Sequence, residues 1–252
     1  MTECRQPLLY VHDMDVRLGG RLILREVSLA VDANTTMAVT GASGCGKTTL
    51  LRAIAGLIAV ERGRIEVCGE NVKSLAANRR GIVYMNQEPL LFPHLNLFEN
   101  IAFGLRLQRK TEAEIRERVA ALIVQLELDG LQRRHTDALS GGQRQRVAFG
   151  RALAVDPRLL LLDEPFSNLD SQTRAGMQDL FKRVCHQRAM TALFVTHDLK
   201  ESIKIGDRFA MIRDGSLHNY ADRRAFCADP ANGVGREIAF WQAFAADADP
   251  QD

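Results

Sequence analysis

The chain has 252 residues, of which 46% are hydrophobic, and it carries 33 Lys and Arg against 31 Asp and Glu. A chain of this length buries roughly three-quarters of the surface of its unfolded form, so folding requires neither disulfides nor a metal. The net charge of +2 gives no electrostatic reason to expect a nucleic-acid-binding protein, and the hydrophobic content excludes a disordered chain.

The cysteines are scattered along the chain without metal-ligand spacing, at Cys4, Cys45, Cys68, Cys185 and Cys227. This pattern predicts neither a disulfide framework nor a zinc site and is typical of a reducing compartment. The first residues lack the layout of a signal peptide. No stretch reaches the roughly 18–20 apolar residues that cross a bilayer, so a membrane role is expected to come through partner proteins.

Short β-branched or leucine-rich runs alternate along the chain with longer amphipathic runs. The predicted strands are Leu8–Val11, Leu22–Val31, Thr36–Thr40, Arg64–Val67, Ile82–Met85, Leu159–Leu162, Ala192–Val195 and Phe209–Ile212. The predicted helices are Lys47–Leu57, Thr111–Leu128, Gly142–Ala154 and Ser171–Arg188. This order predicts an α/β fold with a mainly parallel sheet covered by helices, and the closely spaced N-terminal strands favour an antiparallel subsheet.

A glycine-rich run at residues 41–48 matches G-x-x-x-x-G-K-[ST] and stands between a predicted strand and a predicted helix. Glycines let backbone N–H groups turn towards phosphate oxygens, and the helix points its positive end at the same place. Lys47 is expected to contact the β- and γ-phosphates, and the Thr48 hydroxyl to bind Mg²⁺. The residues predicted to bind the nucleotide are Gly41, Ala42, Ser43, Gly44, Cys45, Gly46, Lys47, Thr48 and Thr49.

Cys45 lies inside this loop and allows two interpretations. It is either a tolerated small side chain or a thiol whose alkylation would block the site, since a helix N-terminus favours the thiolate.

The apolar run Leu159–Leu162 ends in Asp163 and Glu164. Two carboxylates at the carboxyl end of a buried strand are costly unless they bind something, and ligands of open α/β sheets bind at that end. Asp163 is expected to hold Mg²⁺. Glu164 is expected to polarise an attacking water, an effect typically worth roughly 10²–10⁴ in rate.

A Ser-Gly-Gly-Gln sequence opens the helix that follows residue 140. Ser140 can simply cap this helix, but its hydroxyl, the exposed N–H groups and the helix dipole also form a second anion site. Because one nucleotide has one γ-phosphate, two anion sites favour two chains arranged head to tail.

With these motifs, residues 8–220 resemble the ATP-binding subunit of an ATP-binding-cassette (ABC) transporter. Residues 139–143 are similar to the family signature, 41–48 to Walker A and 159–164 to Walker B. Gln87 is similar to the Q-loop glutamine, Asp170 to the D-loop aspartate and His197 to the switch histidine. The fold that the resemblance implies is that of a RecA-like P-loop NTPase with an N-terminal antiparallel subdomain and an inserted helical lobe.

The resemblance implies three sets of site residues. The catalytic residues would be Glu164, His197, Gln87 and Lys47. Mg²⁺ would be held by Thr48, Gln87 and Asp163. The residues that contact ATP across the dimer would be Ser140, Gly141, Gly142, Gln143 and Asp170. For Asp170, capping of the helix over 171–188 is an equally simple interpretation.

Residues 87–105 resemble the segment of bacterial importer subunits that meets the membrane partner. Its apolar side chains exceed what a solvated loop shows, namely Leu90, Leu91, Phe92, Leu95 and Leu97. They can instead cap the core of the helical lobe. The segment 133–138 lacks the Gly-Glu-Arg-Gly-like stretch of exporters, which also favours an importer. The likeness extends to subunits for sugar, polyamine, iron or thiamine uptake, without the C-terminal regulatory domain of the sugar and polyamine types.

The expected function is therefore ATP hydrolysis that powers solute uptake, with ATP and Mg²⁺ as cofactors. The expected partners are a second copy or a similar cassette, integral membrane permease subunits and a substrate-binding protein, with no nucleic acid. The expected location is the cytoplasmic face of the inner membrane. One ABC ATPase domain is expected over 1–244, with a core lobe at about 1–87 and 151–220, a helical lobe at about 88–150 and a frayed tail at 245–252.

Three positions depart from the family pattern. Leu18 replaces the aromatic residue that stacks on adenine, so weakened base stacking is expected. Residues 34–36 replace a Gly-Glu turn, and Asn86 replaces an aromatic residue. The competing functions are a soluble ABC-type ATPase not coupled to transport, a non-hydrolysing nucleotide-dependent interaction protein and a P-loop kinase.

Overall fold

A computed structural model describes residues 7–235 and 239–240. The strands are β1 (Leu9–Leu18), β2 (Arg21–Val31), β3 (Thr36–Thr40), β4 (Arg62–Val67), β5 (Glu70–Asn71), β6 (Ile82–Met85), β7 (Leu159–Asp163), β8 (Ala192–Thr196), β9 (Arg208–Arg213) and β10 (Ser216–Tyr220). The helices are α1 (Lys47–Ala55), α2 (Leu97–Leu107), α3 (Glu112–Gln125), α4 (Gly141–Ala154), α5 (Ser171–Gln187), α6 (Leu199–Ile205) and α7 (Arg223–Ala228), with 3-10 turns η1 (Ala77–Arg79) and η2 (Thr136–Ala138).

The larger sheet has six strands in the order β10-β9-β3-β8-β7-β6. Neighbouring strands from β9 to β6 are parallel, and only the β10–β9 pair is antiparallel. Strand β8 lies between β3 and β7, so the carboxyl ends of these three strands meet at one edge of the sheet. The predicted α/β class with a mainly parallel sheet is confirmed.

Strand β7 is buried on both faces, as expected for a parallel strand covered by helices. Leu160 and Leu162 belong to a hydrophobic core shared with α4 and α5. Leu159 and Leu161, which point the opposite way, belong to a second core shared with α1. Strand β7 therefore lies between two cores and carries Asp163 at its end.

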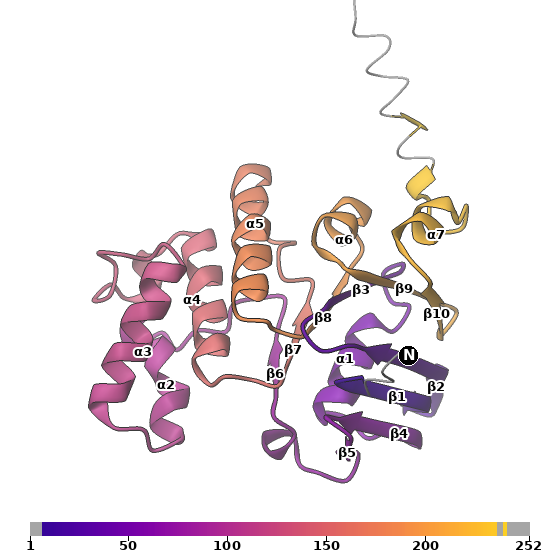
Figure 1. The fold of residues 1–252 in the computed structure, drawn as a ribbon, viewed down its shortest axis with the longest axis horizontal. Coiled ribbons are helices and arrows are strands. Elements are labelled where there is room, and N and C mark those ends of the chain that lie inside the picture. Colours follow the sequence, from indigo (N-terminus) through magenta and orange to yellow (C-terminus); the bar gives the residue numbers. More distant parts are fainter. Residues whose placement is uncertain (1–6, 236–238, 241–252) are drawn as a thin grey trace, which may run out of the picture.

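The second sheet is antiparallel and has four strands in the order β2-β1-β4-β5. Its apolar face packs into the same core as α1 and the β3 residues Met37 and Val39. The predicted antiparallel subsheet is confirmed. Figure 1 shows it at one end of the molecule, with α2, α3 and α4 at the other.

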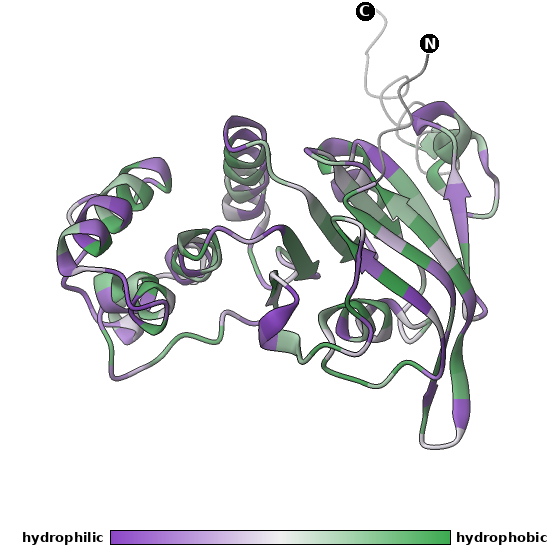
Figure 2. Ribbon diagram, turned by 60° about the horizontal axis from the view of Figure 1, so that its bottom comes forward, coloured by the Kyte–Doolittle hydropathy of each residue, from purple (hydrophilic) through white to green (hydrophobic). Residues whose placement is uncertain are grey.

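The segment 88–150 contains α2, α3, η2 and most of α4, with an isolated β-bridge between Asn96 and His135. Capping boxes begin α3 and α4, at Thr111 and Ser140 respectively. Helix α4 runs past residue 150 to Ala154, so the expected lobe boundary at residue 151 falls inside a helix. Figure 2 shows hydrophobic residues along the strands in the middle of the molecule and mixed faces on the helices.

Several elements lie outside the sequence prediction: α2, α7, β5 and β10. Strand β10 is a mostly exposed edge strand of polar residues, so it lacks the hydrophobic alternation that marks strands. Helices α6 and α7 span only seven and six residues. The expected frayed tail at 245–252 lies outside the described residues. Within the described part of the chain, no helix is long and apolar enough to cross a membrane.

The turn before β3 explains one departure from the family pattern. Asn34 has a φ of 61°, a left-handed conformation in which Asn is tolerated better than most residues. Its N–H donates to Thr191 Oγ1 at 2.9 Å. Asn34 thus replaces a turn glycine without losing the turn.

Candidate functional site

The glycine-rich loop joins β3 to α1 and has the backbone that the motif predicts. Gly41 has a φ of 155° and Gly46 a φ of 110°. A Cβ on Gly41 would lie 2.6 Å from the carbonyl oxygen of Ile212, and one on Gly46 would lie 2.8 Å from a methyl of Leu24. Both positions therefore require glycine, and α1 begins directly after them at Lys47.

Lys47 lies at the base of this loop and is only 5% exposed. Its ammonium donates to the carbonyl oxygens of Gly41 at 2.8 Å and Ala42 at 3.1 Å. Ser43 and Gly44 are exposed at the tip, next to a cavity of about 470 Å³ between β2 and the β9–β10 turn. The loop thus presents backbone N–H groups and one buried cation to this surface, which suits phosphate oxygens.

Thr48 and Asp163 meet at the first turn of α1 and the end of β7. Thr48 Oγ1 donates to Asp163 Oδ1 at 3.0 Å, and Asp163 is 6% exposed. Hydroxyl and carboxylate oxygens are the ligands that Mg²⁺ prefers, and Mg²⁺ is usually held by one or two carboxylates together with substrate phosphates. Their position beside the glycine-rich loop therefore fits a Mg²⁺–nucleotide complex.

Tyr84 on β6 is a site residue that the sequence analysis missed. Its hydroxyl donates to Asp163 Oδ2 at 2.7 Å. Burial and this hydrogen bond raise the pKa of Tyr84 to about 12. A tyrosine directly before Met-Asn-Gln gave no chemical signal in the sequence, because its partner lies 79 residues away on a neighbouring strand.

Glu164 follows Asp163 and has a φ of 45°, a strained conformation for a residue other than glycine. Two hydrogen bonds fix this backbone: its N–H donates to the Val195 carbonyl at 3.0 Å, and its carbonyl accepts from Ser167 Oγ at 3.0 Å. Its Oε2 lies 2.8 Å from Nδ1 of His197, and its Oε1 lies 3.7 Å from the Lys47 ammonium. The strained turn therefore aims the carboxylate at the glycine-rich loop.

Gln87 extends from the segment after β6 towards the same edge of the sheet. Its amide nitrogen donates to Ser167 Oγ at 3.1 Å. In the described structure it makes no hydrogen bond to Thr48 or Asp163, the other residues expected to hold Mg²⁺. Ser167 thus links Gln87 to Glu164, because its hydroxyl contacts both residues. The expected contact of Gln87 with the metal stays a prediction.

Cys45 fits the simpler of its two interpretations. Burial raises the pKa of its thiol, and this effect is larger than the opposing attraction of Lys47. The raised pKa disfavours the alternative interpretation, in which the helix N-terminus activates the thiol. The side chain instead fills space beside Gly41, where an added Cβ would come within 2.6 Å of its sulfur.

The residues expected to act across a dimer lie at two helix starts. Ser140 caps α4: its Oγ accepts from the Gln143 N–H, and the Gln143 side chain accepts from the Ser140 N–H. Asp170 caps α5 by accepting from the Thr173 N–H at 3.0 Å, and hydrogen bonds from the side chain and then the backbone of Thr173 lower the pKa of its carboxyl. No hydrogen bond or ion pair joins residues 140–143 or Asp170 to residues 41–49 among the residues that the structure describes.

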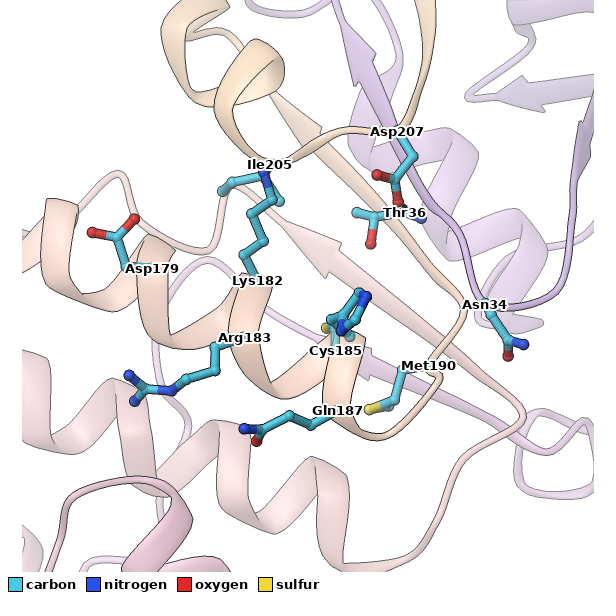
Figure 3. Close-up of a pocket in the computed structure, with 11 residues that line it drawn as sticks. Asn34, Thr36, Asp179, Lys182, Arg183, Cys185, Gln187, Met190, Ile205 and Asp207 are labelled. Atoms are coloured by element: carbon cyan, nitrogen blue, oxygen red, sulfur yellow. Dashed lines mark hydrogen bonds between the residues drawn. The ribbon is translucent and has the colours of Figure 1, made fainter.

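Another cavity, of about 480 Å³, lies away from the glycine-rich loop. Figure 3 shows that residues of α5, such as Lys182 and Cys185, line it together with Thr36 and Asp207. Thr36 begins β3, so this cavity is at the end of the sheet opposite the glycine-rich loop. None of the predicted site residues lines it.

The glycine-rich loop, its buried lysine and the carboxylates at the end of β7 define a P-loop nucleotide-binding protein of the α/β class. The chain belongs to the ABC transporter family, whose model matches residues 24–167.

Proteins with similar sequences support membership in this family. A sulfate/thiosulfate import ATP-binding protein of Bordetella parapertussis is 40% identical over 225 residues, which cover 88% of this chain and 64% of that protein. A protein with the same description from Methylococcus capsulatus is 42% identical, covering 82% of this chain and 61% of the relative. The chain thus spans less than two-thirds of the length of these relatives.

A solved structure has the same fold. It is cbiO1 from Clostridium perfringens, described as part of the ABC transporter complex cbiONQ. The two chains superpose with a TM-score of 0.79 at 25% sequence identity, and the match covers 85% of this chain and 88% of that chain.

Proposed function

We propose that this chain binds ATP with Mg²⁺ and hydrolyses it, as the ATP-binding subunit that powers solute uptake by an ABC transporter. The observation that carries the proposal is the meeting of Lys47, Asp163, Glu164 and His197 at the ends of β3, β7 and β8. Phosphoryl transfer needs chiefly positioning and charge stabilisation, and these side chains supply both.

Each side chain has a role that its contacts support. Lys47 would exchange the carbonyls of Gly41 and Ala42 for the β- and γ-phosphates of ATP. Thr48 and Asp163 would hold Mg²⁺, with Gln87 as a third expected ligand; bound there, the ion would neutralise charge on the phosphates. Glu164 would accept a proton from the attacking water.

His197 would hold Glu164 in place and contact the γ-phosphate. Its ring is 56% exposed, whereas the Glu164 side chain is 18% exposed. The histidine is therefore the accessible partner of the pair, open to an arriving nucleotide. The loop residues 41–49 would surround the phosphates.

We also infer that two chains act together, head to tail, with two ATP molecules between them. Ser140 and Gly141 are exposed at the start of α4, where N–H groups and the helix dipole suit an anion, and Gly142 and Gln143 complete the turn. In the partner chain these residues would contact the γ-phosphate, and Asp170 would approach the same interface. A second copy is the simplest partner, and a similar cassette subunit is the alternative.

A surface groove supports attachment to integral membrane permease subunits. It has a volume of about 270 Å³ and lies between residues 83–92 and the helices α2 and α4. Leu90 is 59% exposed at its edge, and the rings of Phe92 and Phe103 lie 4.4 Å apart. By contrast, Leu97 is fully buried and Leu91 packs on the core of the helices, so these two fit the capping interpretation.

Arg151 is the cation that lines this groove, and Glu88 also lines it. Its guanidinium lies 5.0 Å from the centre of the Phe92 ring and donates to the Leu90 carbonyl at 2.6 Å. Its Nη1 is buried without a hydrogen-bond partner in the structure as described. Apolar walls around a cation suit an apolar segment that carries a carboxylate.

The proposed setting follows from this groove and from the similarity to import ATP-binding proteins. The chain would work as a peripheral subunit at the cytoplasmic face of the inner membrane, with a core lobe (1–87 and 151–220) that binds ATP and a helical lobe (88–150) that meets the permease. A substrate-binding protein would supply the solute.

The test of hydrolysis is Glu164→Gln. We expect ATP binding to persist, phosphate release to fall by roughly 10²–10⁴, and an ATP-bound dimer to accumulate in size-exclusion chromatography with light scattering. The control is Glu112→Gln, at an exposed position on α3 that should behave as the unaltered chain. A Glu164→Gln protein that stays monomeric with unchanged turnover would overturn the mechanism.

The test of docking compares Leu90→Asp with Leu107→Asp, which is 72% exposed on α2 and does not line the groove. Leu90→Asp should abolish co-purification with membrane subunits, while Leu107→Asp should preserve it. Equal retention of both variants would count against this groove as the attachment site.

A further inference from the structure

A chain of polar contacts runs from α1 through β6 to β7 and back to α1. Arg52 on α1 hydrogen-bonds to the Tyr84 hydroxyl, which donates to Asp163 Oδ2 at 2.7 Å. Asp163 Oδ1 accepts from Thr48 at 3.0 Å, one helical turn before Arg52. We infer that Tyr84 is a positioning residue, which fixes the Asp163 carboxylate so that its other oxygen faces the Mg²⁺ site.

The backbone explains why Tyr84 reaches this carboxylate. Strands β6 and β7 are parallel neighbours, with Tyr84 opposite Leu161, two residues before Asp163. The long aromatic side chain spans the remaining distance along the strand direction. A shorter polar residue at position 84 would not bridge it, and a phenylalanine would fill the same space without the hydroxyl.

Hydrogen bonds hold both oxygens of the carboxylate. With Oδ2 held by Tyr84 and Oδ1 by Thr48, the carboxylate has no freedom to rotate. Asp163 is also almost fully buried, so water does not compete for these bonds.

This arrangement matters because Mg²⁺ tolerates little departure from octahedral geometry. Groups that hydrogen-bond to a metal-binding carboxylate orient it, and their loss typically weakens metal affinity by roughly 10–100-fold. Tyr84 would therefore lower the Mg²⁺ concentration at which the site is half saturated. The inference rests on the proposed binding of Mg²⁺ and ATP at this site.

The test is Tyr84→Phe, read through Mg²⁺ dependence rather than through turnover. Binding of a fluorescent ATP analogue would be titrated with and without Mg²⁺, and binding of Mn²⁺ to the nucleotide complex would be followed by electron paramagnetic resonance. We expect the half-saturating metal concentration to rise roughly tenfold, while affinity for the metal-free nucleotide stays within twofold.

The matched control is Tyr220→Phe. Tyr220 on β10 makes an equivalent bond, donating to Asp229 Oδ2 at 2.6 Å, but it lies outside the site. Its loss should change thermal stability without changing Mg²⁺ dependence. This control separates the loss of one Tyr–Asp hydrogen bond from the loss of the bond to Asp163.

Two results would overturn the inference: unchanged Mg²⁺ dependence in Tyr84→Phe, or an equal loss of affinity for metal-free and metal-bound nucleotide, which indicates a purely structural role. Absence of nucleotide binding in the unaltered chain would be a different result, because it would refute the proposed function itself.

Discussion

Nδ1 of His197 lies 2.8 Å from Oε2 of Glu164, at the ends of the adjacent parallel strands β8 and β7. The other oxygen of the same carboxylate lies 3.7 Å from the ammonium of Lys47. Each carboxylate oxygen of Glu164, the proposed general base, therefore contacts another side chain. We expect an arriving phosphate to contact His197 as well, so nucleotide binding would change the position of Glu164.

Replacing His197 with Ala should release Glu164 from this geometry. We expect turnover to fall roughly 10–100-fold, since small misplacements of a reacting group cost rates of that order, while affinity for ATP stays within about threefold. Steady-state phosphate release and equilibrium binding measure the two effects. His12→Ala, at an exposed position on β1, is the control. Unchanged turnover in His197→Ala would remove the histidine from the mechanism.

Leu18 ends β1 and is 43% exposed, where the family resemblance expects an aromatic residue. We predict that the chain discriminates poorly between ATP and GTP, and that Leu18→Trp raises ATP affinity by roughly 2–12-fold, the value of an added aromatic contact. Competition binding with the two nucleotides measures it. The prediction would be wrong if the unaltered chain prefers ATP over GTP as strongly as a relative that has the aromatic residue.

Cys45 should react slowly with alkylating reagents at neutral pH. Burial raises the pKa of its thiol, so less thiolate is present than for a free cysteine, and the rate should climb about tenfold per pH unit below that pKa. Mass spectrometry of iodoacetamide-treated protein measures the rate, with the exposed Cys68 as internal reference. ATP should slow the reaction at Cys45 alone; equal rates with and without ATP would weaken the assignment of the loop.

Arg80 is 6% exposed and holds α1 to the segment before β6. Its guanidinium donates to the carbonyls of Ala53 and Ile54 at the end of α1, and to Lys73 and Leu75. Arg80→Ala would remove these four hydrogen bonds and should lower the free energy of unfolding by about 3 kcal/mol. The midpoint of thermal unfolding should fall by roughly 6–12 °C.

The control for this prediction is the neighbouring Arg79→Ala, whose side chain is exposed. It should change the midpoint by little, because surface substitutions usually act within about 0.5 kcal/mol. Similar melting of both variants would show that the four carbonyl contacts contribute no stability.

The sequence predicted the site well where a motif carries its own local geometry. The glycines of 41–46 need no distant partner to form a phosphate loop, and an apolar strand that ends in Asp163 and Glu164 indicates its place at the sheet edge. The parallel sheet and the antiparallel subsheet followed from the same patterns.

What the sequence did not predict depends on contacts between distant segments. Tyr84 and Asp163 meet because of the register of β6 against β7. The role of Arg80 depends on its hydrogen bonds to carbonyls of α1. The short apolar run near residue 90 divides between core and surface according to how α2 packs, so Leu97 and Leu90 look alike in sequence and differ in exposure. For Cys45 the sequence left two interpretations open, because the balance between burial and the helix terminus depends on packing.

The two-sided burial of β7 has a consequence for motion. Because alternate leucines of this strand belong to two different cores, its backbone amides can exchange with solvent only when both cores open together, which approaches global unfolding. Local opening of α2 and α3 should leave those amides protected. Asp163 and Glu164 thus follow a strand that two cores hold, and we expect its amides to be among the slowest to exchange, which native-state hydrogen exchange measures.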